Sequence, residues 1–393
     1  MKYQAILLTM PTRFSVRRLI GLFLRSLFWS LNVVLVLYTL LIYWLLYDLP
    51  VQHWSASMCM ITLPVAWVLN LICMVTWLFT NRGRSMLSLL VLLAGFWLWP
   101  RTLAWNAPFS DLEGRPTLSL LSYNVTNFQA DDFYTLPAKR NRTRLITDWV
   151  IRHEASVKCF QEFYNSQRHP TLRMADRLRA AGYTHEAVLY PNYRQVSDMF
   201  LGVAIFSKYP IVNQGRKPFG RHSHNGIVWA DIKIGTDTVR IVNVHFESMG
   251  IRVRRVWNQQ EIAGVRTETR GILSSLREGF IARKEQVGVA ETYIANSPFP
   301  VVVTGDFNET PYSVAYGRMR AKLNNAFEDA GRGFGFSLNR APNLLRIDNQ
   351  FYDARQLTPL KFQTLHNVPY SDHFPIYGEY VFMGSRSPKS PHP

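Results

Sequence analysis

Three apolar stretches occupy the first 106 residues of this chain. Leu27–Tyr47 and Cys59–Thr80 contain 21 and 22 residues without a charge. Each is long enough to cross about 30 Å of hydrocarbon at about 1.5 Å per residue. Met86–Trp99 has only 14 residues, but the apolar residues at 103–105 extend it. The pattern predicts a membrane anchor over residues 1–106, an N-terminal bundle of three transmembrane helices at about 20–47, 59–80 and 85–105.

The charges around these stretches predict how the helices cross a membrane. Five basic residues precede the first stretch, none lies between Asp48 and Met58, and two separate the second stretch from the third. They are Lys2, Arg13, Arg17, Arg18 and Arg25, followed by Arg82 and Arg84. Because cytoplasmic loops carry the excess of Lys and Arg, the N-terminus is expected in the cytoplasm. With three spans, the rest of this integral membrane protein faces the periplasmic or extracellular side; if the third fails to cross, it is cytoplasmic.

After residue 106 the pattern changes to short β-type apolar runs that alternate with amphipathic helical segments, which predicts an α/β domain over 107–383. The strands are expected at Gly202–Phe206, Ile227–Ile234, Val239–Val244 and Pro300–Val303, and covering helices at Ala138–His153 and Arg283–Asn296. The last residues, 384–393, are rich in Ser, Pro and basic side chains and are predicted to be a disordered tail.

Four of the apolar runs lead directly into polar side chains that could bind a phosphate or a metal. The run at 301–303 leads to Asp306 and Asn308, which point to the same side of an extended chain. The runs at 118–122, 157–160 and 239–244 lead to Asn124, Glu162 and His245. Since the carboxyl ends of strands in α/β sheets form the ligand crevice, these groups are expected to converge. Taken singly, each has a plainer interpretation, such as a turn residue or a core histidine.

Two further motifs precede the last apolar run, Ile347-Asp348 and Ser371-Asp372-His373. With them the chain resembles the endonuclease/exonuclease/phosphatase superfamily of metal-dependent phosphoesterases, of which deoxyribonuclease I is typical. The resemblance covers Thr117 to Phe382, and its motifs follow the family's order. They are Tyr123-Asn124-Val125, Phe160-Gln161-Glu162, Ile205-Phe206-Ser207-Lys208-Tyr209-Pro210-Ile211, Asn243-Val244-His245-Phe246, Gly305-Asp306-Phe307-Asn308, Ile347-Asp348 and Ser371-Asp372-His373. The chain departs from the pattern after Asp348, where two polar residues stand in place of an aromatic one.

The resemblance implies a four-layer sandwich of two mixed β-sheets flanked by helices, and a role for each site residue. Glu162 becomes the main metal-binding carboxylate, with Asn124 and Asp372 close to the metal. His373 becomes the general base, oriented by Asp348. The remaining roles fall to Asp306 and Asn308, which position the attacking water and the scissile phosphate, and to His245, which stabilises the phosphate oxygens.

The residue types of this set agree with a hydrolytic site of that kind. Attack on a phosphodiester requires that its charged oxygens be neutralised while a base deprotonates water. Ligation by carboxylate, amide and water oxygens suits Mg²⁺ or Mn²⁺, and no Cys or His cluster has zinc spacing. With three Cys only, no disulfide framework is expected.

Charge and anchoring favour different substrates. Of the net charge of +17, the residues after 106 carry +10, an excess that attracts nucleic acid or an acidic lipid surface. Ile251–Glu268 adds Arg252, Arg254, Arg255 and Arg266 around Trp257, which is interpreted either as a lid or headgroup-binding element or as an amphipathic helix on the sheet. The leading prediction is a membrane-anchored, metal-dependent phosphoesterase that cleaves phosphodiester or phosphomonoester bonds by metal- and His-assisted attack of water, with an endonuclease as one candidate.

Two alternatives stay open at the level of sequence. One is a phosphodiesterase acting on phospholipid or sphingolipid headgroups at the membrane surface. The other is a membrane-tethered protein that binds phosphate or lipid without turnover, although the complete set of motifs favours catalysis. In each case the partners are the membrane and an anionic phosphoester, and no obligate protein partner is evident.

Overall fold

The computed structural model describes residues 16–107, 117–189, 199–220, 223–248, 262–341 and 343–383, apart from the side chains of 262–268. The arginines expected at 252–266 and the tail at 384–393 therefore lie outside the described side chains. The chain divides into two compact units. The first comprises Met1–Trp44 and Thr62–Phe96, and the second comprises Leu45–Ile61 and Trp97–Pro393.

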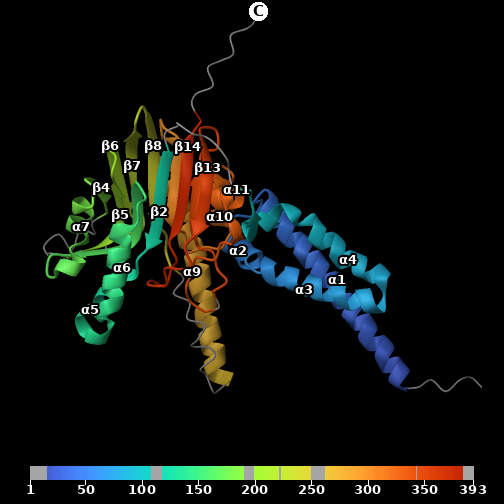
Figure 1. The fold of residues 1–393 in the computed structure, drawn as a ribbon. Helices are drawn as coiled ribbons and strands as arrows, with labels where there is room; N and C mark the ends of the chain where they lie inside the picture. Colours follow the sequence, from blue (N-terminus) through green and yellow to red (C-terminus); the bar gives the residue numbers. More distant parts are fainter. Residues whose placement is uncertain are drawn as a thin grey trace, which may run out of the picture. The chain divides into compact units, whose positions relative to one another are not determined.

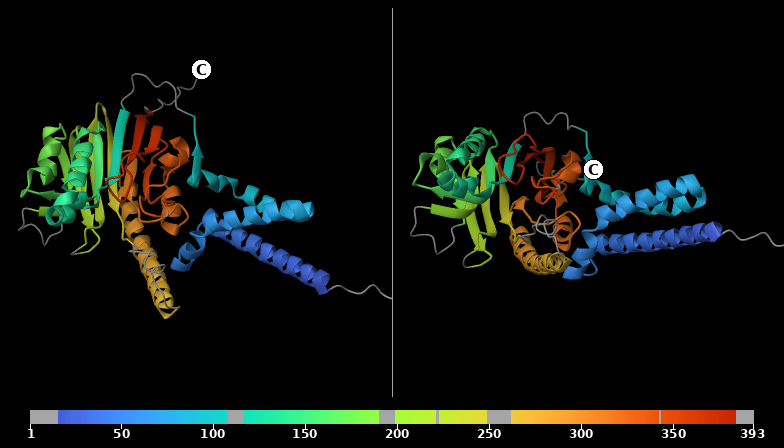
Figure 2. Two further views of the ribbon diagram at one scale, coloured as in Figure 1. Left: turned by 60° about the horizontal axis from the view of Figure 1, so that its bottom comes forward. Right: turned by 90° about the horizontal axis from the view of Figure 1, so that it is seen from below.

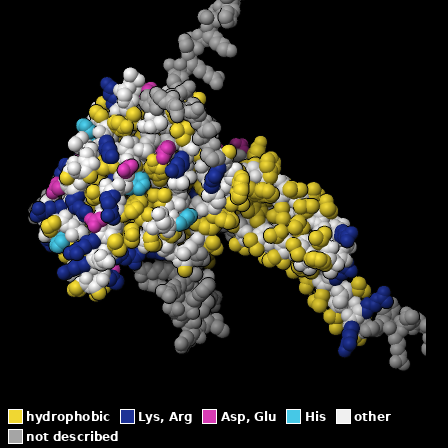
Figure 3. Space-filling view, in the orientation of Figure 1, with side chains coloured by type: hydrophobic (Ala, Val, Ile, Leu, Met, Phe, Trp, Pro, Cys, Tyr) yellow, Lys and Arg dark blue, Asp and Glu magenta, His cyan; other side chains and the backbone are white. Residues whose placement is uncertain are grey.

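The first unit is built from apolar helices, labelled in Figure 1. They are α1 (Val16–Tyr47), α3 (Leu63–Thr80) and α4 (Arg82–Ala94); the short α2 (Trp54–Met60) belongs to the second unit. Two stretches, Val16–Tyr47 and Trp54–Thr80, are long and apolar enough to cross a membrane. Their outward side chains are largely apolar (Figure 3). Inside, the Asn32 Nδ2 donates to the Ser88 Oγ at 2.8 Å and the Asn70 Nδ2 to the Thr39 Oγ1 at 2.9 Å, so buried polar groups join the helices.

The third apolar stretch does not form the helix that its sequence predicts. α4 has 13 residues, about 20 Å at 1.5 Å per residue, and so falls short of about 30 Å of hydrocarbon. It ends at Gly95, where an added Cβ would lie 2.2 Å from the Tyr43 hydroxyl. A 3₁₀ turn, η1 (Phe96–Arg101), follows and contains Pro100, which cannot continue an α-helix. The expected span at 85–105 is therefore wrong in its extent, because 103–105 is a β-strand of the second unit.

The second unit contains two six-stranded sheets of mixed direction. The first has the order β13 (Leu357–Thr364), β14 (Ile376–Phe382), β2 (Thr117–Asn124), β3 (Val157–Ser166), β5 (Met199–Ser207), β4 (His185–Val188). The second has the order β10 (Asn324–Asn325), β12 (Asp348–Tyr352), β9 (Val301–Asp306), β8 (Asp237–His245), β7 (Gly226–Ile234), β6 (Ile211–Pro218). A two-stranded ribbon, β1 (Leu103–Trp105) with β11 (Arg332–Phe334), stands apart from both.

The sheets face each other and helices cover their outer sides (Figures 1 and 2), which confirms the predicted four-layer α/β sandwich. Leu120, Val203, Ile241 and Val302 meet in the core between the sheets. On the outside of the first sheet lie α5 (Ala130–Thr135), η3 (Pro137–Lys139), α6 (Arg140–Arg152), η4 (Pro170–Leu172) and α7 (Met174–Ala180). The second sheet is covered by α9 (Ile262–Ala295) and α10 (Val314–Arg320), while α11 (Ala326–Ala330) packs near β13. Figure 2 shows that α9 extends well beyond the sheets.

Candidate active site

Three of the expected site residues form a row across the second sheet. β8 and β9 run parallel, and their register places His245 beside Asp306. β12 runs antiparallel to β9, and its first residue, Asp348, lies opposite Asp306. Asp306 therefore stands between His245 and Asp348 on neighbouring strands. Sheet register alone accounts for this arrangement of residues that are distant in sequence.

Two more residues reach this row from the first sheet. Asn124 ends β2, and its Nδ2 donates to the Asp306 Oδ2 at 3.0 Å and to the Glu162 Oε1 at 3.1 Å. The Asn124 amide thus bridges the two sheets at their shared edge. Groups separated by 182 residues come together, as the convergence of strand ends predicts.

The run at 157–160 predicted that Glu162 would follow the end of a strand, but Glu162 lies within one. β3 continues to Ser166, and its pairing with β5 shifts register between Phe160 and Phe163. Glu162 sits in this β-bulge with φ 51°, a left-handed conformation that is rare for a residue with a side chain. The bulge turns its carboxylate toward Asn124, so that it points into the site although the strand continues.

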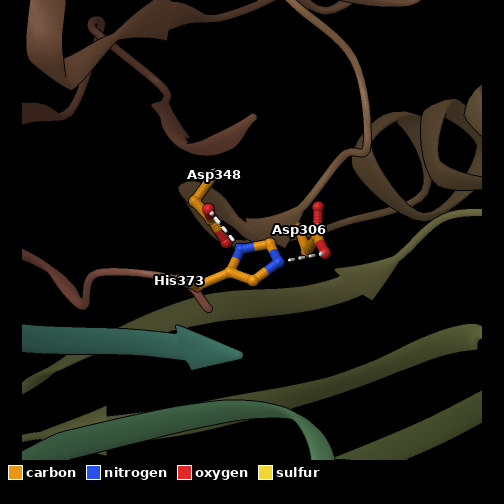
Figure 4. Close-up of side chains that lie close together, drawn as sticks. All are labelled: Asp306, Asp348 and His373. Atoms are coloured by element: carbon orange, nitrogen blue, oxygen red, sulfur yellow. Dashed lines mark hydrogen bonds and ion pairs between the residues drawn. The ribbon is translucent and has the colours of Figure 1, made fainter. Parts of the chain in front are cut away.

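His373 precedes β14 and is held by Asp348 (Figure 4). The His373 Nδ1 lies 2.8 Å from the Asp348 Oδ2, so Nδ1–H can donate to that carboxylate. This bond directs the opposite ring nitrogen, Nε2, toward Asp306 at 3.7 Å from its Oδ2. His373 is thus oriented by one carboxylate and faces another.

The Asp306 Oδ2 is the centre of the cluster. Besides the Asn124 amide, it lies 3.7 Å from the Nε2 atoms of both His245 and His373. The His245 Nε2 also lies 3.9 Å from the Glu162 Oε1. Asp306 is only 1 % exposed, so a small polar ligand at this point would be largely removed from bulk water.

Asn308 lies beside the centre and is fixed by backbone bonds. Its own backbone N–H donates to the Asp306 Oδ1 at 2.8 Å, and its Nδ2 donates to the carbonyl of Phe246 at 3.0 Å. Asn308 has φ 49°, a left-handed conformation that Asn tolerates better than most residues. The loop after β9 is thereby locked to the end of β8.

Asp372 occupies the edge of the cluster and has partners of its own. It accepts a short hydrogen bond from the Thr126 hydroxyl and pairs with Arg340. Neither Asn124 nor Glu162 bonds to it directly, although its charge acts on the pKa of Glu162. A hollow of about 350 Å³ opens beside it and is lined by polar side chains that include Gln129. Asp372 therefore lies at the mouth of the site.

A left-handed turn at residues 126–129 follows β2 and borders the site. Thr126, Asn127, Phe128 and Gln129 have φ between 45° and 55°. Such values are uncommon without Gly and unfavourable above all for the β-branched Thr126. The turn directs the Thr126 N–H to the Asn124 Oδ1 at 3.1 Å and its hydroxyl to Asp372. Backbone strain of this kind concentrates at functional sites, where the surroundings hold it in place.

Burial and mutual charge set the protonation of the cluster. Burial raises the pKa of Glu162 and of Asp306 and lowers that of His245. Burial alone would also raise the pKa of Asp372, but the His373 charge, the Thr126 bond and Arg340 lower it. Burial disfavours the charged form of His373 as well, yet Asp348 and Asp306 outweigh it and raise its pKa to about 10. The cluster thus holds more acidic groups than its own histidines offset.

The donor set fits a hard divalent cation. Glu162 and Asp306 present carboxylate oxygens, while Asn124 turns its Nδ2 to both and its Oδ1 to the Thr126 N–H. Burial disfavours the ionised carboxylates unless a positive charge lies near. Among the described residues, Asp306, Asp348 and His373 place potential ligand atoms within 4.8 Å of one another. Two of these three, Asp348 and His373, already bond to each other through the Nδ1 of the imidazole. Glu162 and Asn124, with Asp372 at the mouth, are the residues that would hold the ion.

Several residues next to the cluster received no role in the sequence analysis. Thr126 and Ser371 share a hydrogen bond at 2.7 Å, and Ser371 donates to the carbonyl of Asn124 at 2.7 Å. Gln161 and Asn243 join the two sheets beneath the site at 2.6 Å. Gln161, Asn243 and Ser371 stand within the motifs that carry the family resemblance, and Asn243 also shares the strand face of His245 two residues away. The two polar residues after Asp348 also find partners: the Asn349 Oδ1 accepts a short hydrogen bond from the Arg346 Nη1, and the Gln350 side chain bonds to Leu120 and Tyr380.

The fold and the site define a hydrolase in which a histidine–carboxylate dyad faces a buried cluster of oxygen ligands. A family model described as the Endonuclease/Exonuclease/phosphatase family matches residues 121–373, and the chain belongs to this family. It is a hydrolase of phosphoester bonds. A second model, a domain of unknown function (DUF8431), matches residues 25–102. A search of curated proteins found no match.

Solved structures of similar fold come from several organisms. The human Nocturnin catalytic domain with bound sulfate is 15 % identical, with 68 % of this chain and 95 % of that chain covered and a TM-score of 0.48. An endonuclease/exonuclease/phosphatase family protein from Bacteroides thetaiotaomicron is 18 % identical, with coverage of 68 % and 98 % and a TM-score of 0.49. Truncated Caenorhabditis elegans TDP2 is 18 % identical, with coverage of 69 % and 100 % and a TM-score of 0.45. Family membership rests on the family model and not on these likenesses.

Proposed function

We propose that this protein is a membrane-anchored, divalent-metal-dependent phosphoesterase in which His373 activates water for attack on phosphorus. The observation that carries the proposal is the His373–Asp348 pair at 2.8 Å, with the free side of the imidazole facing Asp306. This is the geometry of an oriented general base beside a buried anionic cluster.

Each residue of the cluster has a distinct task in this mechanism. Asp348 holds the Nδ1–H of His373, so Nε2 can accept the proton of the attacking water. Asp306 and Asn308 position that water and the scissile phosphate, and the His245 Nε2 donates to a phosphate oxygen. His373 must be neutral to act as base, which requires that the charge of the surrounding carboxylates be offset.

The metal would be Mg²⁺ or Mn²⁺, held by Glu162 and Asn124 with Asp372 at the mouth. When bound, such an ion supplies positive charge that neutralises phosphate oxygens and polarises water. Asn124 would have to turn its carboxamide oxygen, which accepts from the Thr126 N–H, or bind through water. These assignments predict that, among the three residues, substitution of Glu162 has the largest effect on metal affinity.

Membrane anchoring is supported by the two apolar helical stretches, Val16–Tyr47 and Trp54–Thr80. The distribution of Lys and Arg supports a cytoplasmic N-terminus. Because α4 is short, the side on which the catalytic unit lies depends on whether the segment 82–96 crosses. Labelling of single cysteines placed in the catalytic unit of intact cells tests this directly. Modification by a membrane-impermeant maleimide supports the outer side, and protection supports the cytoplasm.

Nucleic acid is the leading substrate because the residues after 106 carry a net charge of +10. A lipid headgroup is the second candidate, favoured by the apolar helices that would keep the site close to a bilayer. Nucleic-acid cleavage should weaken steeply with salt, since each phosphate contact releases a counterion. Activity confined to vesicles or detergent-dispersed lipid would favour the second candidate.

The test is hydrolysis by the purified full chain in detergent, with Mg²⁺ or Mn²⁺ and then with EDTA. The panel contains plasmid DNA, RNA, sphingomyelin, glycerophospholipids and inositol phosphates. Asp306→Ala removes the central carboxylate, and Asp353→Asn is a control at a buried aspartate outside the cluster. We expect activity on one class that EDTA and Asp306→Ala abolish and Asp353→Asn retains. If the folded wild type hydrolyses none of these substrates, a protein that binds phosphate or lipid without turnover is favoured instead.

A further inference from the structure

The segment between the apolar helices and the sandwich is an integral part of the catalytic unit. We call residues 97–106 the strap. Its strand β1 pairs antiparallel with β11, with Ala104 opposite Gly333. Ala104 is 1 % exposed and belongs to the same buried cluster as Phe327 of α11. A domain boundary at 106, as the sequence suggested, would remove this strand from the fold.

Side-chain bonds hold the strap along its length. Arg101 is buried, and its Nη1 donates to the carbonyl of Pro311 at 3.2 Å. Thr102 shares a short hydrogen bond with the Tyr312 hydroxyl. At the far end, the Asn106 Nδ2 donates to the carbonyl of Gly331 at 3.0 Å. The strap is therefore anchored at three points.

One route leads from the strap to the catalytic dyad through Arg346. The Arg346 Nη2 donates to the backbone carbonyl of Arg101 at 2.8 Å and to the Tyr316 hydroxyl at 3.1 Å. The guanidinium groups of Arg101 and Arg346 each lie 5.4 Å from the centre of the Tyr316 ring. Arg346 is only 4 % exposed and stands two residues before Asp348. Displacement of the strap would therefore be transmitted to the backbone that carries Asp348.

A second route runs through Ser337, three residues after β11. The Ser337 Oγ accepts the backbone N–H groups of Ile347 and Asp348, both at 3.0 Å. The Ser337 carbonyl accepts the N–H of Phe374 at 2.7 Å, and the next residue bridges to His373. Ser337 thus holds both halves of the dyad, and the strand that pairs with the strap leads into it.

We infer that the strap positions the Asp348–His373 dyad, with Arg101 and Arg346 as its positioning residues. The inference rests on the proposed function, because it concerns the same site. An error of about 1 Å in the placement of a catalytic group can reduce the rate by about 10²-fold. The segment that joins the apolar helices to the sandwich is in this way a component of the active site's support.

The test uses the full chain with Arg101→Met. This variant removes the strap's bond to the Pro311 carbonyl and its contact with the Tyr316 ring, so the Arg101 carbonyl that accepts from Arg346 is no longer held in place. Arg216→Met is a control for the loss of one arginine bond to a backbone carbonyl away from the strap. Arg216, an exposed residue of β6, donates to the carbonyl of Val188 at 3.1 Å. We expect Arg101→Met to lower kcat by about tenfold or more with KM within about twofold, and Arg101→Lys to restore part of the loss. Arg216→Met should leave both constants unchanged. Wild-type kcat in a folded Arg101→Met protein would overturn the inference.

A second readout does not depend on substrate. The His373 Nδ1–H, bonded to Asp348, should give a low-field proton NMR signal that His373→Ala abolishes. Arg101→Met should shift or broaden this signal, while Arg216→Met should not. If Arg101→Met does not fold, the double variant Thr102→Val/Asn106→Ala is measured instead, and the same changes in kcat and in the NMR signal are expected of it. An unchanged signal in it refutes positioning by the strap. Should the wild type hydrolyse nothing, the proposed function fails while the signal still decides on the strap.

Discussion

A buried ion pair between Arg283 and Glu309 joins the long helix α9 to the loop that carries Asn308. The Arg283 Nε lies 2.7 Å from the Glu309 Oε1, and the Arg283 side chain is fully buried. The Arg283 Nη1 also donates to the carbonyl of Glu247 at 2.8 Å, and Gln286 accepts the Glu247 N–H at 2.9 Å. Glu309 follows Asn308 directly. The pair therefore joins α9, the end of β8 and the end of β9 in one place.

Glu309→Gln leaves the guanidinium of Arg283 buried without its counter-charge. Removal of one partner from such a pair costs about 3–5 kcal/mol. For a domain of this size that corresponds to a fall in Tm of about 10 °C, since about 1 kcal/mol shifts Tm by about 2–4 °C. The double variant Arg283→Met/Glu309→Gln removes both charges and should lose less than the sum of the single variants.

Arg283→Met should behave differently with pH. Burial raises the pKa of Glu309, and Arg283 acts against it, so loss of Arg283 raises the pKa further. An acid with a raised pKa in the folded state binds its proton more tightly there than in the unfolded state. Its contribution to stability is therefore lost as pH rises through that pKa. As the pH falls from 7 to 5, the stability of Arg283→Met should rise relative to that of the wild type, whereas the stability of Glu309→Gln should not.

Unfolding followed by near-ultraviolet circular dichroism at pH 5 and pH 7, for the wild type and three variants, measures these differences. The control is the exposed pair Arg179–Asp176, for which Asp176→Asn should change Tm very little. A Glu309→Gln protein as stable as the wild type would refute the assigned cost of the unpaired charge. Additive losses in the double variant would show that Arg283 and Glu309 act independently.

Three further predictions concern the dyad, the metal and a buried lysine. His373→Ala should lower kcat by about 10²–10⁴-fold in initial-rate assays, with the fold intact; a rate near that of the wild type would exclude His373 as the base. Glu162→Gln should raise the Mn²⁺ concentration needed for half-maximal binding by about tenfold or more, measured by calorimetry; unchanged affinity would exclude ligation. Burial, with Lys208 nearby, lowers the pKa of Lys158 to about 7, so the unfolded chain binds more protons above that value. Wild-type stability in denaturant titrations should therefore rise from pH 7 to pH 9 relative to Lys158→Met, by up to about 1.4 kcal/mol per pH unit; parallel curves would show an unperturbed lysine.

The order of short motifs allowed the sandwich and most of the site to be predicted. Parallel pairing of β8 with β9 brings His245 to Asp306, and strand ends of the two sheets bring Asn124 to the same oxygen. These contacts follow from topology once the strands are recognised. No local pattern near Asn124 indicates a contact with Asp306, because only the fold brings these two side chains together.

Local backbone conformation was not predictable in the same way. The bulge at Glu162 and the left-handed turn from Thr126 to Gln129 lack the Gly that usually indicates positive φ. Both are held by tertiary bonds, such as that from the Thr126 hydroxyl to Asp372. A sequence records the propensity of a residue, whereas here the surroundings override it.

The boundary between anchor and sandwich was misplaced for a related reason. Three residues are too few to show strand periodicity, and Leu103, Ala104 and Trp105 continue an apolar stretch that resembles a membrane span. What separates the two interpretations is distant in sequence: β11 pairs with these residues, and Arg346 donates to the carbonyl of Arg101, 245 positions away. A buried arginine within an apolar stretch is costly in lipid, but in a protein interior it can be satisfied by carbonyls and an aromatic ring. Arg101 was therefore the one residue in the third stretch whose charge argued against a membrane span.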